Sequence, residues 1–148
     1  MIIKEVKAEA EIIAELISLS ESWENEDITY GYRKNSEQYI KENRIFLAVE
    51  KQEIIGYLFG HKEIAQRDTP IYQNGEEYFE VEELYIKPAF RNKGIGTKLF
   101  QYVEQTIKNE VKLIMLGTAT KNYRSILHFY IDEIGMSFWS AALFKRIS

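Results

Sequence analysis

The segment Leu84-Tyr-Ile-Lys-Pro-Ala-Phe-Arg-Asn-Lys-Gly-Ile-Gly-Thr97 decides the fold. An apolar strand ends at its proline, which lacks an N–H donor, and Gly94 and Gly96 then lead into a helix. Glycines let the backbone approach a ligand closely, and the free N–H groups of a helix N-terminus point outward. Arg91 and Lys93 add positive charge. The segment therefore predicts a strand–loop–helix unit that binds an anion such as a pyrophosphate.

Two common nucleotide-binding motifs do not fit this loop. The dinucleotide fingerprint needs a third glycine where Leu99 stands, and the Gly-Lys-Ser/Thr of the P-loop is absent. A tight strand-to-helix turn without a ligand is the alternative reading of the two glycines.

The chain before this segment predicts a short strand and two helices, followed by three strands that form an antiparallel meander. An irregular polar stretch is expected over residues 20–36. Periodicity and turn residues predict helices over 8–19 and 37–42, and strands over 2–6, 45–49, 54–61 and 78–86.

The chain after this segment predicts two more helices and three short strands. Ile95, Leu99, Val103 and Ile107 recur every four residues, so this helix packs one face on the sheet. A second helix is expected over 124–131, and strands over 113–116, 136–139 and 142–147. The order indicates a single α/β domain over residues 1–148, with helices on a mainly antiparallel sheet.

Composition excludes several classes of protein. The net charge of −4 over 148 residues gives no general attraction for nucleic acid or for anionic membranes. The chain has no cysteine and only two histidines, His61 and His128, so no metal is expected. It lacks an apolar run of about 18 residues and a signal peptide, which favours a cytoplasmic location.

The loop also carries a family resemblance. Arg91-Asn-Lys-Gly94-Ile-Gly96 resembles motif A of the GCN5-related N-acetyltransferases (GNAT), Arg/Gln-x-x-Gly-x-Gly/Ala, and the order of elements is similar to that family's throughout. The resemblance implies a mixed sheet of about seven strands flanked by about four helices. It also implies acetyl-CoA as the acetyl donor and an amine as the acceptor.

The family pattern assigns the cofactor residues one by one. Backbone amides of the loop would hold the pyrophosphate beside Arg91, and the end of the preceding strand would pair with the pantetheine like an added strand. The residues so assigned to acetyl-CoA are Leu84, Tyr85, Ile86, Arg91, Lys93, Gly94, Ile95, Gly96, Thr97 and Asn122.

The amine acceptor must lose a proton before it attacks, so a carboxylate base is expected near it. Glu82 lies where several similar proteins place a catalytic glutamate, with Glu80 as the fallback. Glu83 should alternate to the opposite face of the strand. Both candidates could instead be solvated carboxylates on an open strand face.

The departing thiolate needs a proton, and the family pattern Asn-x-x-Ala-x-x-Phe-Tyr supplies a tyrosine. Phe129-Tyr130 matches its end, so Tyr130 is the predicted general acid, with Tyr123 as the runner-up. Asn122 stands eight rather than seven residues before Tyr130, so one extra residue must be accommodated in or after this helix. A core aromatic is the alternative role of Tyr130.

The acceptor is expected to be cationic. Acidic residues cluster around Trp23 and again over 76–83, and the predicted acceptor residues are Trp23, Glu24, Tyr30 and Glu80. The predicted reaction is direct acetyl transfer, in a ternary complex, to a small polycation such as an aminoglycoside or polyamine. A protein N-terminus or lysine is the second choice of acceptor, and an idle acyl-CoA binder is the alternative of another class. Apolar side chains in the last strands, Phe138, Trp139, Leu143 and Phe144, could form a homodimer contact.

Overall fold

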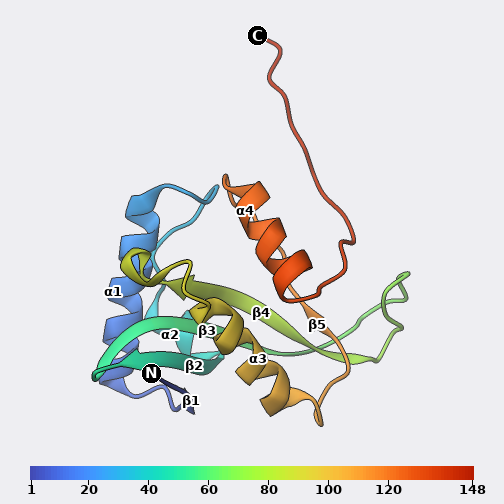
Figure 1. The fold of residues 1–148 in the computed structure, drawn as a ribbon. Coiled ribbons are helices and arrows are strands. Elements are labelled where there is room, and N and C mark those ends of the chain that lie inside the picture. The colour runs from blue at the N-terminus through green and yellow to red at the C-terminus, as the bar shows by residue number, and fades with distance from the viewer.

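One five-stranded sheet forms the centre of the computed structural model, which describes residues 1–148 (Figure 1). The strands lie in the order β1-β2-β3-β4-β5, antiparallel from β1 to β4, with β5 parallel to β4. Their bounds are β1 Ile2–Val6, β2 Arg44–Glu50, β3 Glu53–Ile64, β4 Glu77–Ile86 and β5 Ile114–Met115.

Helices cover both faces of this sheet. Helices α1 and α2 pack on one face and α3 on the other, so the sheet is the middle layer (Figure 1). The bounds are α1 Ala10–Glu26, α2 Glu37–Lys41, the 3-10 turn η1 Pro88–Phe90, α3 Ile95–Ile107, α4 Tyr123–Leu127 and the π-helix η2 His128–Glu133. None of these helices is long and apolar enough to cross a membrane.

The alternation of β2 explains the two-sided core. Ile45 and Leu47 point into the cluster under α1 and α2, whereas Phe46 between them packs with α3. Leu99 and Val103 of α3 are fully or almost fully buried in that second cluster, as their fourfold spacing predicted.

Helix α1 is longer than the sequence pattern predicted. It continues through residues 20–26, which were expected to be irregular, because Ser20 and Trp23 extend its inner face. Asp27 ends it in the left-handed conformation at φ 53°, and its N–H donates to the carbonyl of Glu24.

The prediction of about seven strands is wrong, because the sheet ends at β5. Residues 136–139 and 142–147 are extended but pair with no strand of the chain. The α/β class and the four α-helices agree with the prediction, so the error is confined to the C-terminal segment.

Candidate active site

A cavity opens where β4 and β5 diverge. The two strands pair only at Phe79 with Ile114 and at Glu80 with Met115. Beyond these pairs a cavity of about 1250 Å³ lies between the second half of β4 and residues 116–120, and the loop before α3 closes one side of it. The β4 edge that faces the cavity has no strand partner beyond Glu80, so its backbone groups can pair with a ligand, except that the carbonyl of Ile86 already accepts from Arg91.

The loop before α3 presents a row of unused N–H donors. The amides of residues 92–97 donate to no acceptor in the protein, and the first intrahelical bond runs from Lys98 to the carbonyl of Gly94. Asn92 and Gly94 adopt left-handed conformations in this loop, at φ 62° and φ 80°. Consecutive free amides at a helix N-terminus fit an anionic pyrophosphate.

Gly96 has a different role from Gly94. A Cβ at Gly96 would lie 3.3 Å from the ring of Phe129, whereas a Cβ at Gly94 would meet nothing within 4 Å. Gly96 therefore allows η2 to pack on the start of α3, and Gly94 supplies the backbone conformation of the loop.

Arg91 lies at the cavity, but its charge is already paired. Its guanidinium makes a two-pronged ion pair with Glu26, at 2.7 and 3.0 Å, and its Nε donates to the carbonyl of Ile86. Burial opposes ionisation of Glu26, but hydrogen bonds from Arg91 and Tyr85 outweigh it and lower the pKa of that carboxyl. Arg91 thus joins the end of α1 to the loop, a link that the motif alone did not reveal.

The other residues assigned to acetyl-CoA divide into two groups. Lys93 directs its ammonium over the ring of Phe90, 5.7 Å away, and does not line the cavity. The cavity walls include Leu84, Tyr85, Ile86, Gly94, Ile95, Gly96, Thr97 and Asn122.

A β-bulge sets the direction of the carboxylates of β4. Glu83 pairs with Phe59 and Val81 with Gly60, so Glu82 is an extra residue without a partner on β3. Strict alternation is broken there, and Glu82 and Glu83 both line the cavity. The prediction that Glu83 turns to the opposite face is therefore wrong.

Glu82 is exposed, and its carboxylate lies in the cavity. The hydroxyl of Tyr39 donates to its Oε2 at 3.1 Å, and Nδ1 of His61 lies 3.8 Å from its Oε1. No lysine or arginine pairs with it, so the carboxylate is available to a ligand.

Glu83 is a buried carboxylate whose two oxygens have different surroundings. Its Oε1 accepts hydrogen bonds from Tyr57 at 2.7 Å, Tyr32 at 2.9 Å and Asn35 at 3.0 Å. Its Oε2 accepts no hydrogen bond in the protein. Every fully buried side-chain nitrogen or oxygen of the protein has a hydrogen-bond partner, so Oε2 is not fully buried and solvent reaches it. Burial raises the pKa of Glu83, although the three donors counteract this.

An aromatic wall stands beside Glu83. Trp23 stacks on Tyr32 with ring centroids 4.1 Å apart and on Tyr85 at 5.4 Å. All three side chains line the cavity, and an aromatic face next to a carboxylate suits an organic cation. The sequence had indicated Trp23, but the hydrogen bond from Tyr32 to Glu83 spans 51 residues and has no local signal.

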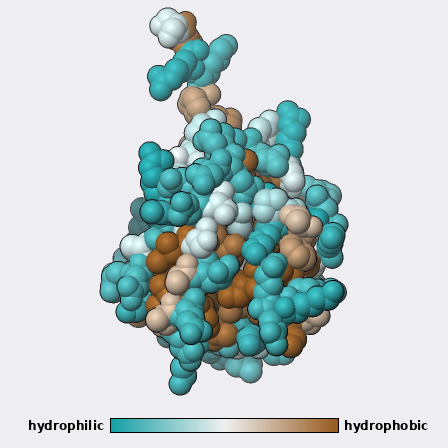
Figure 2. Space-filling model, turned by 90° about the vertical axis from the view of Figure 1, so that its left-hand side faces the viewer, coloured by the Kyte–Doolittle hydropathy of each residue, from teal (hydrophilic) through white to brown (hydrophobic).

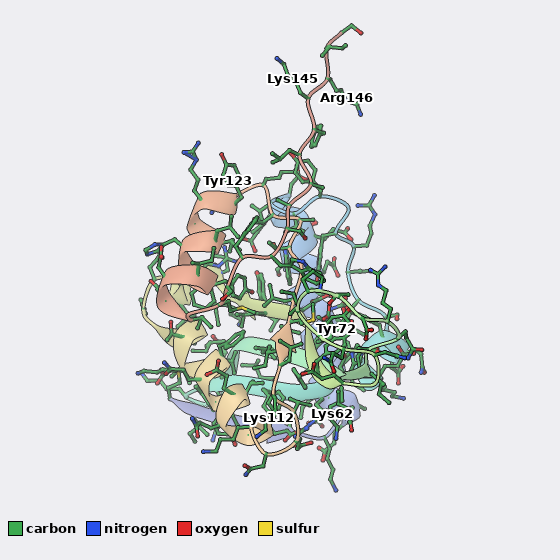
Figure 3. All side chains as sticks on the ribbon, turned by 90° about the vertical axis from the view of Figure 1, so that its right-hand side faces the viewer. Lys62, Tyr72, Lys112, Tyr123, Lys145 and Arg146 are labelled. Atoms are coloured by element: carbon green, nitrogen blue, oxygen red, sulfur yellow. The ribbon has the colours of Figure 1, made fainter.

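Tyr130 lies in the π-helix η2 and lines the cavity. The N–H of Ile134 donates to the carbonyl of Phe129, five residues back, so the π-helix absorbs the extra residue that the sequence pattern required. Burial raises the pKa of Tyr130 to about 12, so its phenol is neutral and holds its proton. Tyr123, the runner-up, is exposed at the outer end of α4, outside the cavity (Figure 3).

Three of the predicted acceptor residues do not reach the cavity: Glu24, Tyr30 and Glu80. Glu24 accepts from the backbone N–H of Lys34, and Tyr30 packs against Phe144. The acidic cluster near Trp23 is also partly neutralised, because Glu26 pairs with Arg91 and Asp27 with Lys121. The carboxylates that line the cavity are Glu82 and Glu83 of β4 and Glu133 of η2.

Glu80 gives a prediction about stability. Burial, Glu82 and Glu63 raise its pKa to about 7, and the nearby His61 counteracts this. The folded state thus holds this proton more tightly than the unfolded chain, so Glu80 destabilises the fold increasingly as pH rises from about 4.5 to 7. We expect Glu80→Gln to raise Tm at pH 8 and to leave Tm nearly unchanged at pH 4.5, in thermal melts with Glu77→Gln as the control. Equal changes at both pH values would contradict this assignment.

The chain matches the model of the Acetyltransferase (GNAT) family over residues 11–136. It belongs to this family. The resemblance of the loop at Arg91 is thereby confirmed, and so is the prediction of an acyltransferase.

Solved structures show how widely this GNAT fold is shared. An aminoglycoside acetyltransferase from an uncultured soil metagenomic sample superposes with a TM-score of 0.71 at 15% identity, covering 99% of this chain and 98% of that one. A ribosomal-protein-alanine N-acetyltransferase from Brucella melitensis biovar Abortus 2308 gives 0.67 at 14%, covering 99% and 100%. An aminoglycoside N-acetyltransferase in complex with CoA also gives 0.67 at 14%, covering 99% of each chain.

Proposed function

We propose that this GNAT protein transfers the acetyl group of acetyl-CoA to a primary amine of a small polycation, such as an aminoglycoside or a polyamine. The observation that carries this proposal is the buried Glu83, with Oε1 held by three donors and Oε2 left open beside Trp23 and Tyr32. A fixed carboxylate next to stacked rings attracts an ammonium group. The similarity to aminoglycoside acetyltransferases supports the same substrate class.

Acetyl-CoA fits the other half of the cavity. The free amides of residues 92–97 would hold its pyrophosphate, and the unpaired edge at Leu84, Tyr85 and Ile86 would hydrogen-bond its pantetheine. Asn122 lines the same part of the site. Acetyl-CoA supplies the activated acetyl group, and no metal is needed for the step.

Two side chains move protons in the proposed reaction. Glu82 removes a proton from the bound ammonium, directly or through water, and the neutral nitrogen then attacks the thioester carbonyl carbon. The carbon–sulfur bond breaks, and Tyr130 gives its proton to the departing sulfur. Glu83 binds the cation, so the adjacent carboxylates of the bulge divide binding and catalysis between them.

The choice of acceptor is tested by measuring thiol release from acetyl-CoA. The panel contains aminoglycosides, polyamines, peptides with a free N-terminal alanine, and lysine-containing peptides. We expect turnover with the small polycations and little with peptides. Turnover with peptides alone would favour a protein acetyltransferase, and cofactor binding without any turnover would favour an idle acyl-CoA binder.

The division of roles gives a paired prediction for the two glutamates. Glu83→Gln keeps an oxygen for the three donors but turns an NH₂ group toward the cavity, so KM for the amine should rise about tenfold or more. Glu82→Gln should instead lower kcat at neutral pH by about 10²-fold, with recovery at higher pH where the amine is already neutral. Steady-state kinetics from pH 6 to 10 separate the two effects. Identical kcat and KM profiles for both variants would contradict the proposed roles.

A further inference from the structure

Arg91 makes its contacts with the end of α1 and not with the loop that carries it. Its guanidinium binds both oxygens of Glu26, at 2.7 and 3.0 Å, and its Nε donates to the carbonyl of Ile86 at 2.8 Å. The end of α1 and the loop before α3 lie at the left of Figure 1, the side that faces the viewer in Figure 2, where polar residues in teal surround apolar ones in brown. A carboxylate of the protein itself therefore neutralises the charge of Arg91.

Glu26 connects this ion pair to the aromatic wall of Trp23, Tyr32 and Tyr85. Its Oε2 accepts a hydrogen bond from the hydroxyl of Tyr85 at 2.7 Å. The guanidinium of Arg91 also lies over the ring of Tyr85, 5.2 Å from its centroid. Burial and the carboxylate of Glu26 raise the pKa of Tyr85, so its hydroxyl stays protonated and donates. One ion pair thus holds Tyr85 at both its hydroxyl and its ring.

The contacts continue from Tyr85 to the buried carboxylate of the cavity. The ring of Tyr85 stacks on Trp23, with centroids 5.4 Å apart, and Trp23 stacks on Tyr32 at 4.1 Å. The hydroxyl of Tyr32 then donates to Oε1 of Glu83 at 2.9 Å. A continuous set of contacts therefore runs from Arg91 to the carboxylate that is proposed to bind the amine.

We propose that Arg91 and Glu26 are positioning residues for the amine acceptor, and that Arg91 is not a ligand of the cofactor pyrophosphate. The inference rests on the proposed function. Glu26 forms an ion pair with no other lysine or arginine, so a move of Arg91 to a phosphate would leave a partly buried carboxylate without its counter-ion. The free amides of residues 92–97 can hold a pyrophosphate without Arg91. The arginine of this loop therefore serves the other substrate.

Steady-state kinetics with the polycation and calorimetry with acetyl-CoA separate the two possible roles. We expect Arg91→Gln and Glu26→Gln each to raise KM for the amine about tenfold, with kcat and the affinity for acetyl-CoA changed by less than about threefold. The double variant should be no worse than either single variant, because both act through one ion pair. If Arg91→Gln lowers the affinity for acetyl-CoA and leaves KM for the amine unchanged, Arg91 is a cofactor ligand and the proposal is wrong.

Arg44 offers a matched control for the loss of an ion pair. It binds both oxygens of Glu5 on β1, at 2.8 and 3.1 Å, and its side chain is 29% exposed against 32% for Arg91. It does not line the cavity. Arg44→Gln should therefore leave KM for the amine and the affinity for acetyl-CoA unchanged. A rise of the amine KM in Arg44→Gln equal to that in Arg91→Gln would mean general loosening of the fold and would overturn the positioning role.

Trp23 provides a test that needs no amine. The chain has two tryptophans, so Trp139→Phe leaves Trp23 as the single indole fluorophore. In this background we expect Arg91→Gln and Glu26→Gln each to increase the quenching of Trp23 by acrylamide, and Arg44→Gln to leave it unchanged. Unchanged quenching in the first two variants would overturn the inference. Increased quenching without turnover of any amine would contradict the proposed function and support the positioning of the aromatic wall.

Discussion

Gly94→Asp is expected to lower the affinity for acetyl-CoA by about 10²-fold or more while the fold is retained. The new carboxylate would stand next to the free amides of residues 92–97, where it would occupy donors and repel a pyrophosphate. Each charge-assisted hydrogen bond contributes about 1.5–3 kcal/mol, so losing two of them gives this magnitude. The structure has room for the side chain, since a Cβ at Gly94 meets nothing within 4 Å.

Calorimetric titration with acetyl-CoA measures this effect, and the chain offers a matched control. Gly75 has a similar left-handed conformation, φ 92° against 80°, and a Cβ there would also meet nothing within 4 Å. Gly75→Asp therefore introduces the same charge and the same backbone strain far from the loop. Unchanged affinity in Gly94→Asp, or an equal loss in both variants, would show that the loop does not bind the pyrophosphate.

The strand–loop–helix unit at Arg91 could be predicted from the sequence because its signals are local. A strand end, two glycines and a helix start lie within 14 residues, and each leaves its own residue preference. The fourfold apolar spacing of α3 then fixes which side of the helix faces the sheet. The ion-pair partner of Arg91 could not be predicted from such local signals, because Glu26 lies 65 residues away on α1.

The proposed acceptor side was harder to predict because a single backbone irregularity changes which face of the strand a side chain lies on. Without the bulge, alternation sends Glu82 and Glu83 to opposite sides of β4; with it, both line one cavity. No residue of β4 signals the bulge, since Val81, Glu82 and Glu83 are all ordinary strand residues there. The burial of Glu83 depends on Tyr32, Asn35 and Tyr57, which come from three other parts of the chain.

The C-terminal segment, residues 137–148, shows where prediction from composition fails. Its residues have the composition of strands, and the expectation of two strands followed from that composition. A strand, however, needs an edge to pair with, and residues 137–148 make no backbone hydrogen bond.

Tyr130→Phe is expected to lower kcat by about 10²-fold, with little change in Tm or in the affinity for acetyl-CoA. The substitution keeps the ring, which packs against Phe129 and Phe100, and removes only the hydroxyl of a side chain that lines the cavity. That hydroxyl makes no hydrogen bond within the protein, and the pKa of Tyr130, raised to about 12 by burial, keeps it protonated across the working pH range. Its one remaining use is to donate to a ligand in the cavity, and the departing sulfur is the group that needs a proton.

Steady-state kinetics, a thermal melt and a binding titration of Tyr130→Phe together decide this role. Tyr123→Phe is the matched control, because it removes a tyrosine hydroxyl from the same helical segment but outside the cavity, and it should leave kcat unchanged. A loss of Tm comparable to the loss of kcat would make Tyr130 a packing residue. An unchanged kcat in Tyr130→Phe would instead assign the proton transfer to water, since no other tyrosine of α4 or η2 reaches the cavity.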